Sequence, residues 1–180
     1  AVDDSVLQVH AVQRPDRALF DATSARAWTL AYAARSAHPF ALALPAYSVR
    51  VDTDAQGRVR AVDAEADIER GGAGGRELRA EPREVAAYLR EITEDAPPRL
   101  TGFVWFRLPV PGDRRGWSAT TLAAVIAGND LVAEFATEWL AQDGGTTDIW
   151  IKNVGNIDAA PPTHALPVHC PSADALAGFR

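Results

Sequence analysis

Five side chains of types that bind ligands or move protons lie near the ends of three apolar segments: Gln8, His10, Tyr47, Trp105 and Arg107. Histidine titrates near neutral pH and serves as an acid, a base or a ligand. The rings of tyrosine and tryptophan offer flat apolar surfaces. An interior amide or guanidinium costs several kcal/mol unless it finds partners. These five side chains are therefore candidates for a ligand-binding site.

Some of these residues also have a purely structural explanation. A single inward-facing aromatic side chain, here Tyr47 or Trp105, more often fills space than binds a ligand. His10 is explained equally well as a buried histidine that its neighbours satisfy. Gln8 and Arg107 are harder to explain as packing because of the cost of burying their polar groups.

The segments that carry these residues alternate with helices. Apolar residues alternate or run continuously over 5–12, 40–47 and 101–109, which is typical of strands. Helical spacing predicts helices over 22–37, 82–94 and 117–127, with Asp21 as a cap and Pro82 at a first helical position. A strand, a helix and a strand in this order form a parallel crossover unit. The sequence therefore predicts an α/β fold with three parallel strands.

In such folds, ligand groups gather at the carboxyl ends of the strands. We expect one face of each strand to point Gln8, His10, Tyr47, Trp105 and Arg107 into a common mouth. We expect helices to cover the opposite faces, which hold Leu7, Val9, Phe40, Leu42, Leu44, Val104, Phe106 and Leu108.

The other segments predict hairpins and a loop. Apolar and polar residues alternate over residues 48–62 on both sides of a turn at Asp54 to Gly57, which predicts an inserted β-hairpin. The acidic residues of this segment are ordered as in a calcium-binding loop, but the bidentate Glu of such a loop is absent, so a plain turn is favoured. Residues 63–80 contain GGAGG and predict a mobile loop. We expect an α/β domain over 1–129 and a small all-β appendage over 130–180, with strands at 131–141, 147–152 and 163–170.

Charge and cysteine content exclude several kinds of function. The net charge of -6 disfavours nucleic acid as a partner, and no apolar stretch is long enough to span a membrane. Cys170 is the sole cysteine, which excludes an intrachain disulfide and a multi-thiolate metal site. A site shared by His164, His169 and Cys170 is improbable because the two histidines fall on opposite faces of a strand. We therefore expect no metal or cofactor.

Two basic residues, Arg114 and Arg115, precede the helix predicted at 117–127. Anions often bind in this place in barrels, so both are candidates for anion binding. Solvated surface charges are the simpler explanation.

The runs VLQVHAVQRP, FALALPAYS, GFVWFRLP and RRGWSATTL, followed by DIWIKNVGN and HCPSADALAGF, resemble domain-of-unknown-function family 3142, an uncharacterised bacterial family. This family is similar to glycoside hydrolases of the (β/α)8 barrel type with a small β domain. The resemblance implies that the three strands are the C-terminal strands of such a barrel, followed by a small antiparallel β domain. The chain has no methionine, and we expect that it is trimmed at its front or cut from a longer protein.

The first functional hypothesis is a barrel fragment that binds or hydrolyses a glycan at the strand ends. Hydrolysis needs two carboxyl groups, and no Asp or Glu ends any predicted strand, so the catalytic residues stay unknown. The alternatives are a non-catalytic or envelope-associated interaction module and a complete open α/β domain with an unrelated small-molecule site.

Exposed strand edges favour a homo-oligomer. A glycan ligand favours an extracytoplasmic location, with a cytoplasmic one left open.

Overall fold

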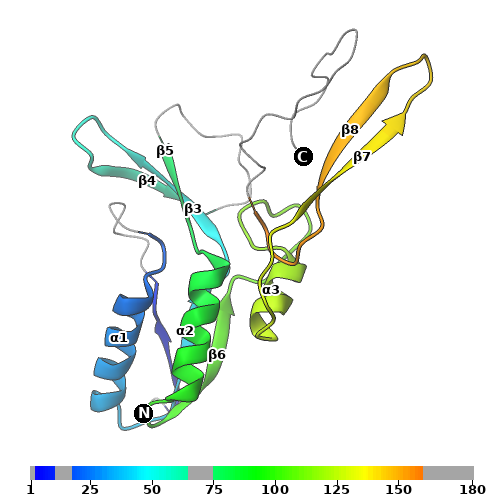
Figure 1. Ribbon diagram of the computed structural model, residues 1–180. Coiled ribbons are helices and arrows are strands. Elements are labelled where there is room, and N and C mark those ends of the chain that lie inside the picture. The colour runs from blue at the N-terminus through cyan, green and yellow to red at the C-terminus, as the bar shows by residue number, and fades with distance from the viewer. Residues whose placement is uncertain (1–2, 11–17, 65–74, 160–180) are drawn as a thin grey trace.

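A computed structural model describes residues 3–10, 18–64 and 75–159 (Figure 1). Its central feature is a parallel sheet of β1 (Ser5–Gln8), β2 (Phe40–Pro45) and β6 (Leu100–Phe106), in the order β1-β2-β6. The prediction of a mixed α/β fold with three parallel strands is confirmed.

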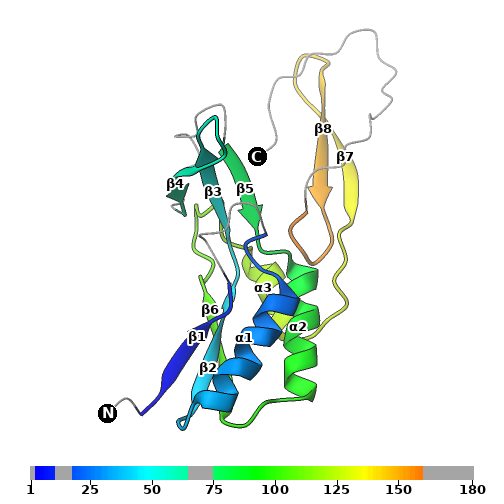
Figure 2. The same ribbon diagram turned by 90° about the vertical axis from the view of Figure 1, so that its left-hand side faces the viewer.

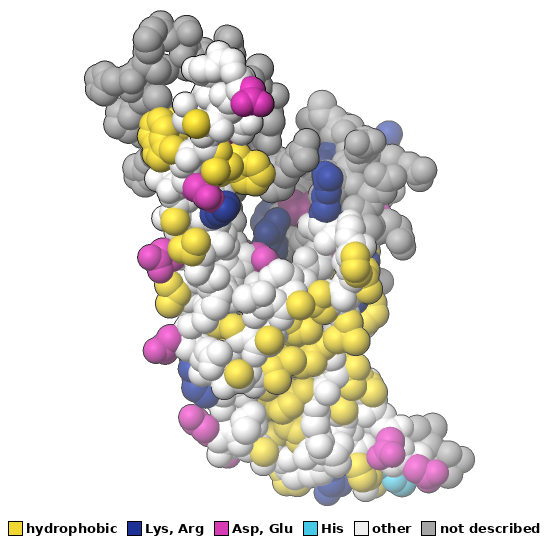
Figure 3. All heavy atoms as spheres, turned by 90° about the vertical axis from the view of Figure 1, so that its right-hand side faces the viewer, with side chains coloured by type: hydrophobic (Ala, Val, Ile, Leu, Met, Phe, Trp, Pro, Cys, Tyr) yellow, Lys and Arg dark blue, Asp and Glu magenta, His cyan; other side chains and the backbone are white. Residues whose placement is uncertain are grey.

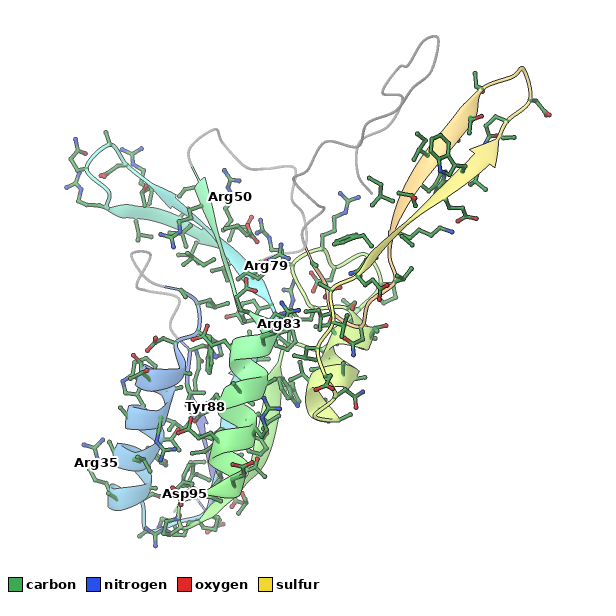
Figure 4. All side chains as sticks on the ribbon, viewed as in Figure 1. Arg35, Arg50, Arg79, Arg83, Tyr88 and Asp95 are labelled. Atoms are coloured by element: carbon green, nitrogen blue, oxygen red, sulfur yellow. The ribbon has the colours of Figure 1, made fainter. Side chains whose placement is uncertain are left out.

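Two helices cover one face of this sheet (Figures 1 and 2). The first, α1 (Ala22–Arg35), begins where the Asp21 side chain accepts a hydrogen bond from the Ser24 amide at 2.7 Å. The second, α2 (Pro82–Glu94), has the predicted bounds and buries Val85, Tyr88 and Ile92. Tyr88 lies between the two helices (Figure 4), and its hydroxyl is 2.8 Å from the Thr29 hydroxyl on α1. This hydrogen bond satisfies both buried groups and ties the helices together.

The hydrophobic core lies between the helices and the central strand. Phe40, Leu42 and Leu44 of β2 point into it and are 0% exposed. The opposite face of the sheet carries apolar side chains that none of the described helices covers: Val6 is 58%, Val104 43% and Phe106 52% exposed. Figure 3 shows apolar side chains gathered in a band on the β6 side of the molecule. Parallel sheets are usually covered on both faces, so this open face is unusual.

The prediction that helices cover Val104, Phe106 and Leu108 is wrong. In the register of β2 and β6, Leu44 lies beside Trp105, and Pro45 lies beside Phe106. Neighbours in register point to the same face, so Trp105 accompanies Leu44 toward the helices. Phe106 therefore points to the open face, and Leu108 is 63% exposed.

A second sheet is inserted between β2 and α2, in the order β4-β3-β5. Its strands are β3 (Ser48–Thr53), β4 (Val59–Asp63) and β5 (Gly75–Arg79). The first two form a hairpin where the sequence predicts one, and Asp54 Oδ1 accepts amide hydrogen bonds from Gln56 and Arg58 in its turn. The loop expected over 63–80 thus contains a strand, β5, that pairs with β3. Residues 65–74 of that stretch lie outside the described residues.

The last described elements are α3 (Ala119–Ile126), β7 (Phe135–Ala141) and β8 (Thr147–Asn153). Ser118 caps α3 by accepting the Thr121 amide at 3.1 Å, and β7 and β8 pair as an antiparallel hairpin. The strand expected at 163–170 lies outside the described residues. Within the described part of the chain, no helix has the length and apolar character required to span a membrane.

Candidate functional site

Three of the five predicted site residues come together just beyond the carboxyl ends of the parallel strands. His10 follows β1, Tyr47 follows β2 and Arg107 follows β6. The rings of His10 and Tyr47 lie 5.6 Å apart edge-on, and each lies close to the Phe106 ring, at 6.0 and 5.3 Å. His10 and Tyr47 are 5% and 2% exposed. We call the cluster of His10, Tyr47, Phe106, Arg107 and Asp113 the strand-end site.

The other two predicted residues take different places. Trp105 lies on the helix side of the sheet, 6.2 Å from the Trp117 ring, and the structure does not bring it to the strand-end site. Gln8 is exposed at the end of β1, and its side-chain amide donates to the His10 carbonyl at 3.2 Å. Phe106 takes the place at the strand ends that the sequence suggested for Trp105.

Asp113 is a residue of the site that the sequence did not single out. Its Oδ1 accepts hydrogen bonds from Arg107 Nη2 at 2.5 Å and from the amides of Arg115 and Gly116 at 2.9 and 3.1 Å. Its side chain is only 2% exposed. A Cβ at Gly116 would lie 2.9 Å from Asp113 Oδ2, so glycine at this position gives the carboxylate its room.

Several polar atoms of the site are buried without a hydrogen-bond partner. Four such side-chain atoms occur among the described residues, and three of them belong to the strand-end site: His10 Nδ1, Arg107 Nε and Asp113 Oδ2. The fourth belongs to Arg26, whose Nη1 forms an ion pair with Glu91 at 2.8 Å. Buried polar atoms usually find partners, so these three atoms are the donors and acceptors of the site that have no hydrogen bond among the described residues.

Burial and charge set the ionisation of the site. Burial lowers the pKa of His10 from 6.5 to about 4, and the nearby Ala43 backbone, too far or too poorly aligned for a full hydrogen bond, opposes this shift only in part. Burial raises the pKa of the Tyr47 hydroxyl, opposed by the charge of Arg107. Burial also tends to raise the pKa of Asp113, but the hydrogen bonds from Arg107 and the two amides outweigh it and leave that pKa below its usual value. At neutral pH the site therefore holds neutral His10 and Tyr47 beside an ionised Arg107–Asp113 pair.

The predicted anion-binding residues differ from each other in their surroundings. Arg114 is exposed. Arg115 is buried, and its Nη1 lies 2.9 and 2.8 Å from the two carboxylate oxygens of Glu77, while Nη2 lies 3.7 Å from Asp63. Ser48 Oγ donates to the same Glu77 at 2.5 Å. The guanidinium of Arg115 thus joins the inserted sheet to the loop after β6. Because it already forms ion pairs with protein carboxylates, it is not available to bind an anionic ligand.

We predict that Glu77→Gln lowers the free energy of unfolding by about 2 kcal/mol, because it removes the negative charge and one of the two oxygens that accept from the buried Arg115 guanidinium. The expected cost is moderate because Arg115 keeps Asp63 nearby and because the Glu77 side chain is 38% exposed. Urea unfolding followed by circular dichroism measures the change. The matched control is Glu81→Gln at the exposed start of α2, and an equal loss in both variants would contradict the role assigned to Glu77.

The described residues do not assemble a metal site at the strand ends. No group of three or more His, Cys, Asp or Glu side chains is placed to hold a metal within residues 3–10, 18–64 and 75–159. His164, His169 and Cys170 lie outside these ranges. Asp113 is ionised and bound to Arg107, which suits it to accept hydrogen bonds and makes it a poor proton donor at neutral pH.

Comparison of the sequence with models of known protein families gives a match. The family described as Domain of unknown function (DUF3142) matches residues 1–111. The chain belongs to this family. A search of curated proteins finds no match, and a search of solved structures finds none either.

The DUF3142 match covers the whole parallel sheet, helices α1 and α2 and the inserted sheet. His10, Tyr47, Phe106 and Arg107 fall within it, and Asp113 lies two residues beyond its end. Most of the strand-end site is therefore part of the DUF3142 segment, whereas α3 and the β7–β8 hairpin follow it.

Proposed function

We propose that this DUF3142 protein binds an uncharged, hydroxyl-rich ligand, such as a sugar unit of an oligosaccharide, at the strand-end site. The observation that carries the proposal is the concentration of buried polar atoms without partners in His10, Arg107 and Asp113. A sugar hydroxyl both donates and accepts hydrogen bonds, so it suits a set that contains the donor Arg107 Nε and the acceptor Asp113 Oδ2.

The charges of the site favour a neutral ligand over an anion. The charge of Arg107 is offset by Asp113 at 2.5 Å, and the charge of Arg115 is offset by Glu77 and Asp63. His10 adds no charge because burial keeps its pKa low. A carboxylate or phosphate ligand would therefore have to compete with the protein's own acids. Beside these groups, the rings of Tyr47 and Phe106 supply apolar surface against which a sugar ring packs.

We further propose that the three parallel strands are the C-terminal strands of a (β/α)8-type barrel. Within the described ranges, helices cover only one face of the sheet, as on the outside of such a barrel, and the open face with Val6, Val104 and Phe106 would point to its axis. The strand-end site would then lie at the carboxyl face, where barrel proteins bind ligands.

Binding is favoured over hydrolysis for the described residues of the strand-end site. A glycosidase needs a protonated carboxyl group to assist departure of the leaving group. The lowered pKa of Asp113 makes it unsuited to that role. The alternative to a glycan-binding or glycan-hydrolysing protein is a non-catalytic interaction module on the same scaffold. The lowered pKa of Asp113 favours this alternative over a hydrolase, because it leaves the strand-end site without a protonated carboxyl group at neutral pH.

Calorimetric titration with neutral glucose, xylose, galactose and N-acetylglucosamine tetramers tests the proposal. We expect one of these oligosaccharides to bind the wild-type chain, and Arg107→Gln and His10→Gln to weaken that binding about tenfold or more, since each removes a polar contact. Arg114→Gln and His38→Gln remove the same groups at exposed positions and should leave affinity unchanged.

Circular dichroism checks that each variant is folded. Absence of binding by all four tetramers would overturn the proposal. Equal affinity in folded Arg107→Gln and wild-type protein would also overturn it, because the ligand would then bind elsewhere.

A further inference from the structure

The β7–β8 hairpin stands out from the rest of the molecule as an arm (Figure 1). Trp139 on β7 is 61% exposed and Trp150 on β8 is 51% exposed, and they point to opposite faces because Trp139 pairs with Ile149 and Trp150 with Glu138. Large apolar side chains exposed on both faces of a two-stranded sheet are unfavourable in water, and two strands alone are marginally stable. The arm therefore has the character of a surface that needs a partner.

The base of the arm is firmly attached. Ile157 is 5% exposed, and Asp158 both accepts the Ser118 amide and donates its own amide to Thr121 Oγ1, each at 2.7 Å. A Cβ at Gly155 would meet the Val132 carbonyl oxygen at 2.2 Å, which shows how closely the two ends of the hairpin approach. The arm is thus held at its base to α3 and presents its outer strand edges in a defined direction.

The sequence of β8 is self-complementary in charge and shape. Its seven residues, TDIWIKN, have Trp150 at the centre. When two such strands align antiparallel so that all seven residues pair, Trp150 meets its own counterpart. In the same register, Ile149 lies opposite Ile151, and Asp148 lies opposite Lys152, twice by symmetry. Opposite charges and β-branched residues directly across from each other stabilise antiparallel pairs.

The other edge of the arm lacks this property. β7, FATEWLA, also has seven residues, and its centre is Glu138. The corresponding symmetric register would place two Glu138 carboxylates directly opposite each other, which is destabilising. Charge thus distinguishes the two edges of the hairpin and favours β8.

We propose that β8 is the edge through which two copies of this chain associate, pairing antiparallel about Trp150. Among the described residues, β8 has β7 as its only strand neighbour. The backbone N–H and C=O groups on its outer edge can therefore form hydrogen bonds with a strand of another chain. Association about a two-fold axis turns two hairpins into one four-stranded antiparallel sheet. Lys152, the only lysine of the chain, would lie between Glu138 of its own hairpin, its present ion-pair partner, and Asp148 of the second copy.

Sedimentation equilibrium of charge variants tests this pairing. Wild-type protein should dimerise with rising concentration. Lys152→Asp places four acids in two repulsive pairs across the axis and should raise the dissociation constant about tenfold or more. The double variant D148K/K152D exchanges the two charges, re-creates both attractive pairs and should restore dimerisation.

Glu138→Gln is the matched control, because it removes the hairpin's internal ion pair and leaves the β8 edge as it is. It should dimerise like wild type. A wild-type chain that stays monomeric at all concentrations would overturn the proposal. Failure of D148K/K152D to recover what Lys152→Asp loses would overturn it too, because a surface that uses Lys152 in another way is not rescued by exchanging the charges.

Disulfide trapping gives a geometric test that does not depend on affinity. In a background where Cys170 is replaced by serine, Trp150→Cys places one thiol on the symmetry axis, where opposite Cα atoms lie about 4.5 to 5.5 Å apart and can form a disulfide. Trp139→Cys places an equally exposed thiol on β7, away from the axis. We expect a covalent dimer on mild oxidation for the first variant and not for the second; equal trapping by both would contradict pairing through β8.

Discussion

Leu42→Ala should lower the free energy of unfolding by about 3 kcal/mol, since truncating a fully buried leucine removes its packing and leaves a cavity. Leu42 is 0% exposed in the middle strand of the parallel sheet, with Leu7 and Phe103 beside it in register. It points to the face that α1 and α2 cover, where the core is densest. Urea unfolding monitored by circular dichroism measures the loss.

The matched control for this prediction is Leu108→Ala, which removes the same atoms at an exposed position just after β6. Leu108 is 63% exposed, so its truncation should cost less than about 1 kcal/mol. If both variants lose the same stability in this chain, Leu108 is covered in solution and its exposed position after β6 is wrong.

The strands and helices were predictable because their signals are local. The apolar run FALALP of β2 indicates a strand covered by other layers, and the structure places it in the centre of the sheet. Pro82 at the first helical position and the stripe of Val85, Tyr88 and Ile92 gave α2 its bounds to the residue. Each of these signals depends on residues a few positions apart.

The face of β6 was not predictable in the same way. Alternation groups Trp105 with Arg107, and polar character suggested that both point into the mouth. The strand ends at Phe106, and its register against β2 shifts between Phe40 and Ala41. Which face of the sheet Trp105 points to depends on this register and on the side on which the helices pack. The residues of the strand alone determine neither of these.

The acidic partners of Arg107 and Arg115 were missed for different reasons. Glu77 lies in a charged stretch that predicts a loop, and it becomes part of a strand only because β3 pairs with it. Its partner Arg115 is 38 residues away. Asp113 offered a weak local signal, since it lies six residues after Arg107 and two before Arg115, and an acid placed between two arginines is a natural partner for either.

The stability of the protein should fall as the pH is lowered from 7 to 5, with a contribution of about 2 kcal/mol from His10 alone. Burial lowers the pKa of His10 in the folded protein from 6.5 to about 4. Between these two values the unfolded chain binds a proton that the folded protein does not. Protonation therefore favours the unfolded state, and the stabilising contribution, complete above pH 6.5, is lost progressively until the pH reaches about 4.

Urea unfolding at several pH values measures this dependence, and two variants isolate its source. His10→Gln removes the titrating group from a buried position and should flatten the dependence between pH 7 and 5. His38→Gln removes a histidine from an exposed position and should leave the dependence as in wild type. A wild-type stability that stays constant over this range would mean that the imidazole of His10 accepts its proton without cost and is not buried among Tyr47 and Phe106. The site would then be open to water, and its polar atoms would need no ligand to satisfy them.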